Sequence, residues 1–380
     1  MANIFGENTK KLGFGLMRLP HTDPNDESRI DLELTKKMVD HFLEQGFTYF
    51  DTAWMYCGFK SEDAVKEVLV DRYPRESFTL ATKLHGAFFN TPEEMDRIFD
   101  TQLKKTGVSY FDYYLLHDVG EDHYKKYTQL KCFEWLAAKK EAGLVKHIGF
   151  SYHDGAELLD RVLSEHPEVE FVQLQLNYLD WESEAIQSRK CYETCVKYGK
   201  PVIVMEPVKG GTLANVVPEV EKLFKDYHPD MSVASWAIRF AATQPNVAMV
   251  LSGMGNMEMM RDNTDYMKDF VPLDAGELEL LQKAVGLINA SIAIPCTGCS
   301  YCVDGCPMKI AIPKYFSLYN LEKQEYEGKG FTPQGGYYHR LTQNFGKASE
   351  CVECGLCESV CPQHLPIREN LKLVAKQFEG

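Results

Sequence analysis

The chain has 380 residues, of which 44% are hydrophobic, a length that is long for one domain and short for three and a composition that can build a sizeable core. Its formal net charge at pH 7 is −14 and it contains no basic block, which argues against nucleic acid and anionic membranes as partners. Residues 1–12 carry no apolar stretch of the signal-peptide type, and no apolar run approaches the length of a membrane span, so we expect a cytoplasmic protein.

Between residues 12 and 289, short apolar runs alternate with amphipathic stretches. Eight runs have the length and composition of buried strands: Gly13–Arg18, Phe47–Asp51, Phe78–Thr82, Asp112–Leu116, His147–Phe150, Phe171–Leu176, Val202–Met205 and Val247–Leu251. The stretches between them, such as 38–43, present one apolar helical face. This α/β alternation predicts a TIM-type (β/α)8 barrel. A doubly wound open sheet is the alternative, but no Gly-x-Gly-x-x-Gly turn opens the first unit.

Polar side chains stand at the ends of three successive strand-like runs. Asp51 closes the second run, Lys83 follows the third and His117 follows the fourth. Tyr56 lies five residues past Asp51. Each residue taken singly could be an ordinary loop or core residue. Since a barrel places its chemistry at the carboxyl ends of its strands, we expect the four side chains to converge.

These four residue types suit one kind of chemistry. A phenol with a pKa near 10 is a poor acid at pH 7, but a buried ammonium beside it lowers that pKa. A carboxylate can hold the ammonium in place, and a neutral imidazole can donate a hydrogen bond to a carbonyl oxygen. Together they form a general acid that protonates a carbonyl group while a hydride reaches its carbon.

The run Asp51–Tyr56, followed by Lys83 and His117, resembles the catalytic tetrad of the aldo-keto reductase superfamily. Segments 12–18 and 148–151 resemble that family too, and the resemblance covers about residues 10–270. It implies a (β/α)8 barrel, NADPH or NADH as hydride donor and a small-molecule aldehyde or ketone as substrate. By this resemblance Tyr56 is the general acid, Lys83 and Asp51 tune it, and His117 orients the carbonyl.

The same resemblance implies a set of nicotinamide-binding residues. Ser151 and Gln173 match the family's contacts to the nicotinamide carboxamide. Met205 stands where the family usually places an aromatic ring against the nicotinamide.

The loop 252–263 corresponds to the family's NADP-binding loop. Gly253 and Met259 stand where basic residues often bind the 2′-phosphate, and Asp262 and Asn263 match the pair that contacts adenine. These departures leave NADPH, NADH and weak nicotinamide binding open.

Eight of the twelve cysteines form two copies of the pattern C-x2-C-x2-C-x3-C-P. The two runs are Cys296, Cys299, Cys302 and Cys306, and Cys351, Cys354, Cys357 and Cys361. In two-cluster ferredoxins with this spacing, the fourth cysteine of each run ligates the other cluster. We therefore expect two 4Fe–4S clusters, with Cys306 and Cys361 exchanged between the runs. A zinc site needs only four ligands, and disulfides suit short secreted chains, so both are disfavoured.

The change of character near residue 290 predicts a barrel domain over 1–290 and a smaller, mainly helical ferredoxin-like domain over 291–380. The whole chain is similar to microbial members of the superfamily with such a tail. We expect the clusters to exchange electrons with a partner such as ferredoxin. Two alternatives are a ferredoxin-fed reductase that does not use nicotinamide and a non-catalytic redox sensor or scaffold. The segment Gly335–Tyr338 could be a lid over the barrel mouth or part of a tail that wraps the barrel.

Overall fold

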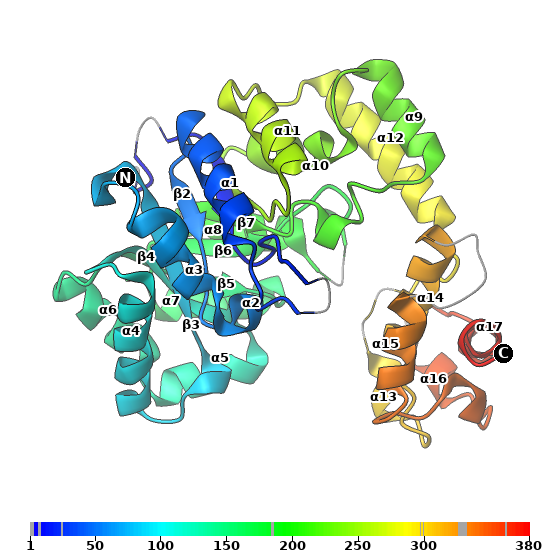
Figure 1. Cartoon of the computed structure of the whole chain (residues 1–380). Coiled ribbons are helices and arrows are strands. Elements are labelled where there is room, and N and C mark those ends of the chain that lie inside the picture. The colour runs from blue at the N-terminus through cyan, green and yellow to red at the C-terminus, as the bar shows by residue number, and fades with distance from the viewer. Residues whose placement is uncertain are drawn as a thin grey trace. The chain divides into compact units, whose positions relative to one another are not determined.

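The computed structural model describes residues 4–6, 9–23, 26–183, 186–296, 298, 300–325, 333–361 and 363–380. The chain forms two compact units (Figure 1). The larger unit is built from Met1–Glu182, Ile186–Asn215 and His228–Leu278, and the smaller mainly from Val216–Tyr227 and Glu279–Gly380. Among the described residues, no helix is both long enough and apolar enough to cross a membrane.

The larger unit is a closed barrel of eight parallel strands in chain order, which confirms the predicted TIM-type fold (Figure 1). The strands are β1 (Leu12–Gly15), β2 (Tyr49–Asp51), β3 (Thr79–His85), β4 (Phe111–Val119), β5 (Val145–Tyr152), β6 (Phe171–Gln175), β7 (Val202–Met205) and β8 (Val247–Ser252). β1 ends at Gly15, three residues before the predicted end, although the backbone N–H of Leu16 still donates to the carbonyl of Asp51 on β2.

The interior of the barrel is filled by side chains from alternate positions of the strands. On β3 and β4 the inward residues include Ala81, Tyr113 and Leu115. Because strand residues alternate between faces, the next inward positions on β3 are Lys83 and His85. The interior of the barrel is therefore apolar in its middle and becomes polar at the carboxyl end of β3.

Helices cover the outside of the barrel, and several of them have an apolar stripe. On α7 (Ala156–Glu165), Leu159 and Val162 are fully buried, and burial of such a side chain stabilises the fold by roughly 1.5–3 kcal/mol. The other helical elements of this unit are α1 (Leu32–Glu44), α2 (Tyr56–Phe59), α3 (Ser61–Val65), η1 (Lys66–Val70), η2 (Arg75–Ser77), η3 (Gly86–Phe88), α4 (Pro92–Thr106), α5 (Glu121–Gln129), α6 (Cys132–Glu141), α8 (Ser188–Lys197), η4 (Lys209–Gly211), α10 (Val233–Thr243) and α11 (Met257–Lys268).

The smaller unit is mainly helical, as predicted. Its elements are α9 (Pro218–Tyr227), the greater part of α12 (Ala275–Ser291), α13 (Tyr301–Asp304), α14 (Ile312–Glu325), α15 (Pro333–Leu341), η5 (Ala348–Glu350), α16 (Leu356–Ser359) and α17 (Ile367–Phe378). Tyr315, Phe316 and Tyr338 lie in its core, and the Tyr338 ring stacks on Phe378 with centroids 5.0 Å apart. Within the segment Gly335–Tyr338, Tyr338 thus contributes to the core of this unit.

Candidate active site and cluster-binding site

The centre of the candidate active site is Lys83, which lies near the carboxyl end of β3 with no exposed surface. Its ammonium donates to Asp51 Oδ1 at 2.5 Å and to the carbonyl oxygen of Thr52 at 2.8 Å. Burial is the largest single effect on the pKa of Lys83 and lowers it, but the charges of Asp51 and Tyr56 and the hydrogen bonds to them together raise it. The ammonium is therefore charged and held in one place.

Tyr56 lies beside this ion pair at the start of α2. Lys83 Nζ is 3.5 Å from Tyr56 Oη and 5.0 Å from the centre of its ring. The segment that follows is not a regular helix, because φ is 51° at Cys57, 58° at Gly58 and 69° at Phe59. For residues other than glycine this left-handed conformation costs roughly 1–2 kcal/mol, and such strain clusters at functional sites.

The acidity of Tyr56 differs from the expectation. Burial raises the pKa of its phenol above the ordinary value and outweighs the lowering by Lys83. Lys83 lowers this pKa, as predicted, but burial has the larger effect. The ammonium makes its two short bonds to Asp51 and Thr52 and reaches the phenol only at 3.5 Å. Tyr56 is consequently protonated at neutral pH.

His117 completes the predicted set on β4. Its ring lies edge-on to that of Tyr56, with centroids 6.0 Å apart. Burial lowers the pKa of His117 well below its ordinary value, and the charge of Lys83 adds to that effect, so the imidazole is neutral. The structure thus brings Asp51, Tyr56, Lys83 and His117 together, as expected from their order along the strands.

The predicted carboxamide contacts lie on neighbouring strands, because Ser151 on β5 is in register with Gln173 on β6. Both side chains are buried, and Gln173 Nε2 is 3.5 Å from Met205 Sδ. Gln173 Oε1 is buried and has no hydrogen-bond partner in the part of the chain described. A buried acceptor without a partner fits a ligand that brings an N–H group, as a nicotinamide carboxamide does.

At the predicted phosphate loop, Gly253 is exposed and lies under the side chain of Arg18. A Cβ added at Gly253 would come within 3.3 Å of Arg18 Cδ, so Arg18 takes the space that a basic residue at 253 would need. Arg18 Nη2 also approaches Gly210, near which Glu206 Oε2 lies as well. Arg18 is exposed and forms no ion pair with the described residues. The sequence did not indicate this residue, since only closure of the barrel brings β1 beside β8.

The other residues of this loop are largely engaged within the protein. Asp262 Oδ2 accepts from Ser232 Oγ at 2.7 Å. Asn263 Nδ2 donates to Ser252 Oγ at 2.6 Å, and Met259 is half exposed. Contact of Asp262 and Asn263 with adenine stays a prediction.

Two further polar residues at the carboxyl ends of the strands were missed. His85 is paired in register with His117, and Asp118 follows His117 directly. The two-residue period of β3 contains the signal for His85, since it stands two positions after the inward Lys83.

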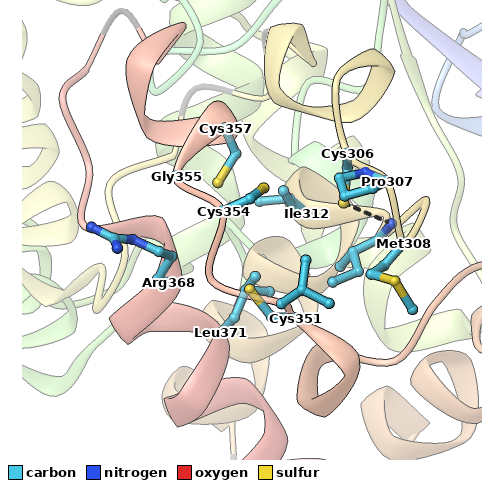
Figure 2. A pocket seen from close by; sticks show the side chains of 12 residues that line it. Cys306, Pro307, Met308, Ile312, Cys351, Cys354, Gly355, Cys357, Arg368 and Leu371 are labelled. Atoms are coloured by element: carbon cyan, nitrogen blue, oxygen red, sulfur yellow. Dashed lines mark hydrogen bonds between the residues drawn. The ribbon is translucent and has the colours of Figure 1, made fainter.

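The cysteines of the smaller unit surround two pockets. Cys306, Cys351, Cys354 and Cys357 line the first (Figure 2). Ile310 donates its backbone N–H to Cys306 Sγ at 3.5 Å. This grouping joins the last cysteine of the first run to the first three of the second. Such a backbone hydrogen bond to sulfur is one of the features that set the potential of an iron–sulfur cluster.

The second pocket is lined by Cys296, Cys302 and Cys361, with Phe316 and Leu365 among its apolar residues. Cys299 lies outside the described residues. Here the last cysteine of the second run joins the first run. Converging thiols in an apolar surround fit 4Fe–4S clusters. The described cysteines are all free thiols, and ligation by the eight cysteines stays a prediction.

Two family models match the chain. The aldo/keto reductase family matches residues 11–285, and the 4Fe-4S dicluster domain matches residues 295–365. An uncharacterized oxidoreductase of Schizosaccharomyces pombe is 24% identical over 263 residues, which cover 67% of this chain and 80% of that protein. A probable aldo-keto reductase of Glycine max is 26% identical over 219 residues, covering 54% of this chain and 58% of that protein.

Solved structures of similar fold include the holo form of an aldo-keto reductase from Bacillus halodurans, with a TM-score of 0.58 and 23% identity over 72% of this chain and 91% of that one. An aldo/keto reductase from Klebsiella pneumoniae in complex with NADP and acetate has a TM-score of 0.59 and 18% identity over 72% of this chain and 91% of that one. At these identities the likeness extends to the fold of the barrel.

Proposed function

Because the chain belongs to the aldo/keto reductase family and contains a 4Fe–4S dicluster domain, we propose that this oxidoreductase reduces an aldehyde or ketone with NADPH or NADH, or oxidises the alcohol, and that two 4Fe–4S clusters carry its electrons. The buried contact of Lys83 with both Asp51 and Tyr56 is the observation that carries the proposal. Burying a charged lysine costs free energy, and charged groups buried in this way are found mainly at functional sites.

The residues of the site have different roles in carbonyl reduction. The neutral imidazole of His117 donates a hydrogen bond to the carbonyl oxygen and orients it. Tyr56 Oη gives its proton to the same oxygen, and the phenolate left behind is stabilised by the ammonium of Lys83 at 3.5 Å. When bound, a reduced nicotinamide supplies the hydride that adds to the carbonyl carbon. Hydride and proton together convert the carbonyl into the alcohol.

The cofactor is held, in this proposal, by residues on three sides of the barrel mouth. Ser151 and Gln173 bind the carboxamide, and Met205 packs against the ring in place of an aromatic residue. Gly253 keeps the loop open for the phosphates, and Arg18 supplies the cation that the loop lacks. Asp262 and Asn263 border the adenine.

In the smaller unit, Cys296, Cys299, Cys302 and Cys361 hold one cluster, and Cys351, Cys354, Cys357 and Cys306 hold the other. A 4Fe–4S cluster, when bound, passes one electron at a time. The pocket linings support this division of the ligands. We place the boundary between the two domains near residue 290 and expect a ferredoxin-like protein as electron partner.

The proposal is tested by purifying the protein without oxygen, counting iron and sulfide, and screening carbonyl compounds with NADPH and NADH. Tyr56→Phe is expected to lower turnover at least about tenfold, because a positioned general acid supplies about 10²–10⁴-fold. Tyr110→Phe is the control, since Tyr110 contacts Lys146 at the amino end of the barrel strands. Normal turnover by Tyr56→Phe would refute the assignment of the acid.

Nicotinamide binding is measured separately by quenching of tryptophan fluorescence. Tight binding of either dinucleotide supports the proposal. If neither binds while reduced ferredoxin drives turnover, the reductase takes its electrons through the clusters without nicotinamide. A preparation that contains only zinc would contradict the assignment of the clusters.

A further inference from the structure

A second polar group lies at the barrel mouth beside His117, built from His85, Asp118 and His123. The ring of His85 is 5.0 Å from that of His117 and 4.9 Å from that of His123, centre to centre. Asp118 Oδ2 is 3.9 Å from His85 Nε2 and 3.5 Å from His123 Nδ1. The proposed reduction does not use these three residues.

Hydrogen bonds to the backbone fix where the imidazole protons are. The backbone N–H of Ala87 donates to His85 Nδ1 at 3.0 Å, so Nδ1 is the acceptor and the proton of the neutral ring is on Nε2. Burial lowers the pKa of His85, which keeps that ring neutral at pH 7. His123 Nδ1 lies 3.0 Å from the backbone carbonyl oxygen of Asp118, and because a carbonyl can only accept, His123 Nδ1 carries a proton as well.

This arrangement does not suit a metal ion, although the three side chains lie close enough to one another to hold one. A ligating imidazole nitrogen must present a lone pair. Both nitrogens that face Asp118 are N–H donors, and moving the His85 proton to Nδ1 would set it against the Ala87 N–H. The group is better described as two donors around one carboxylate.

The backbone presents Asp118 in an unusual way. Its φ is 58°, in the left-handed region, and the pairing of β4 with β5 shifts register between Leu116 and Val119. Its backbone N–H donates to Ser151 Oγ at 2.8 Å, which holds the residue in this conformation. Irregular pairing of this kind next to a site re-aims a side chain.

The carboxylate of Asp118 and the Nε2–H of His85 do not satisfy each other. Their separation of 3.9 Å exceeds a hydrogen bond, and neither group makes a side-chain hydrogen bond to the described residues. The side chain of His85 is 13% exposed and that of Asp118 is 39% exposed, so a ligand can reach both. A hydroxyl oxygen placed to one side of the line between these two atoms can accept from His85 and donate to Asp118 at normal distances, so the pair can bind one hydroxyl group.

We propose that His85 and Asp118 bind a hydroxyl group of the substrate, so that the substrate is a hydroxylated aldehyde or ketone whose hydroxyl is close in the carbon chain to the reacting carbonyl. The inference rests on the proposed function, because His117 beside His85 orients that carbonyl. A site with unsatisfied polar groups rejects an analogue that lacks the hydroxyl, because those groups then stay unpaired.

The test compares substrates that differ by one hydroxyl: glycolaldehyde with acetaldehyde, and hydroxyacetone with acetone. The wild-type protein is expected to prefer the hydroxylated member at least about tenfold in kcat/KM. His85→Phe keeps an aromatic ring but removes the donor, and is expected to reduce the preference about tenfold. Asp118→Asn, which tolerates the left-handed backbone, should reduce it in the same direction. His147→Gln, at the amino end of β5, is the control and should keep the preference.

The outcomes separate the two proposals. Equal kcat/KM for both members of each pair in the wild type overturns the hydroxyl site while leaving carbonyl reduction intact. If no carbonyl is reduced at all, the proposed function fails, and binding then decides the hydroxyl site. In that case hydroxyacetone should still raise the melting temperature more than acetone does in the wild type and not in His85→Phe, and equal rises overturn the proposal.

Discussion

Asp51 and Lys83 form an ion pair whose side chains are almost entirely removed from water. Separating such charges from water costs several kcal/mol each, and only their close contact offsets it. The pair therefore adds little net stability, yet neither member can be lost without leaving a buried charge. This explains how one carboxylate fixes the ammonium that faces Tyr56.

Asp51→Asn is expected to destabilise the protein by about 3–5 kcal/mol and to abolish most turnover, because Lys83 is left without its counter-charge. Thermal unfolding of the anaerobic protein, together with turnover, measures both effects. Asp71→Asn breaks the exposed pair with Lys66 and is the matched control, with an expected change below about 1 kcal/mol. Equal loss in the two variants would contradict the role given to Asp51.

The pH dependence of reduction follows from the two shifted groups. The raised pKa of Tyr56 keeps the phenol protonated at neutral and mildly alkaline pH, and the lowered pKa of His117 keeps the imidazole neutral at neutral pH. We expect kcat for reduction to be level from about pH 7 to 9 and to fall only when the phenol loses its proton. A decline that begins near pH 7 would mean that, with the cofactor bound, the lowering of the Tyr56 pKa by Lys83 exceeds the rise caused by burial.

At the scale of single residues, the sequence predicted which four side chains meet because each follows a strand, and parallel strands bring their carboxyl ends together. It did not predict the raised pKa of Tyr56, which depends on how completely the fold buries the phenol. Nor did it indicate that Arg18 lies over Gly253, a contact between the segments that follow the first and the last strand of the barrel.

Among the elements, α5 ties the ends of two catalytic strands together through Tyr127. This fully buried tyrosine accepts from the backbone N–H of Gly86 at 2.9 Å and donates to the carbonyl oxygen of His117 at 2.5 Å. One side chain therefore sets the spacing of β3 and β4 where His85 and His117 stand. Both β3 and β4 extend past their predicted ends, and it is near these extended ends that Tyr127 joins them.

Tyr127→Phe is expected to lower kcat several-fold and to leave the KM for NADPH unchanged, because it loosens His117 without touching the cofactor side of the barrel. The loss of stability should be about 1–3 kcal/mol, since buried groups lose their partner. Tyr124→Phe, on the same helix, removes the bonds of that hydroxyl to Glu165 and Thr128 and should leave kcat unchanged. Equal effects on kcat would show that α5 does not position His117.

The periodicity of the sequence predicted the strands well but their ends less well. β3 continues to His85 and β4 to Val119, past the points where the apolar runs stop. Strand pairing there is maintained by backbone bonds and by Tyr127, and polar residues carry no hydrophobic pattern that would reveal it. The irregular segment after Tyr56 was equally hidden, because two of its three left-handed residues are not glycine.

Across the whole molecule, two folding principles are combined. The barrel follows from alternating hydrophobic runs, whereas the smaller unit is organised around cysteines and a modest core of helices. The spacing of the cysteines predicted their grouping without any information on packing. Nothing in the pattern of residues 218–227 indicates that α9 groups with the C-terminal unit, since an amphipathic helix does not specify which neighbour covers it.

Exchange of ligands between the two runs predicts a pattern of iron loss. Cys306→Ala should remove about half of the iron, and adding Cys351→Ala should remove no more, because both residues serve one cluster. Combining Cys306→Ala with Cys302→Ala should remove nearly all of it. Iron and sulfide analysis with electron paramagnetic resonance measures the loss, and Cys195→Ala, a buried thiol on α8, is the control. Further loss with Cys351→Ala would mean that the runs do not exchange ligands.

The crossed arrangement of the cysteines also has a consequence for biosynthesis. Each pocket is lined by cysteines of both runs, so the ribosome has to translate the second run before either pocket can close. The cysteines of the first run leave the ribosome first and stay exposed to solvent until the second run follows. Insertion of iron and sulfide is then a post-translational event that matures both centres together, and a nascent chain arrested between the runs would acquire neither.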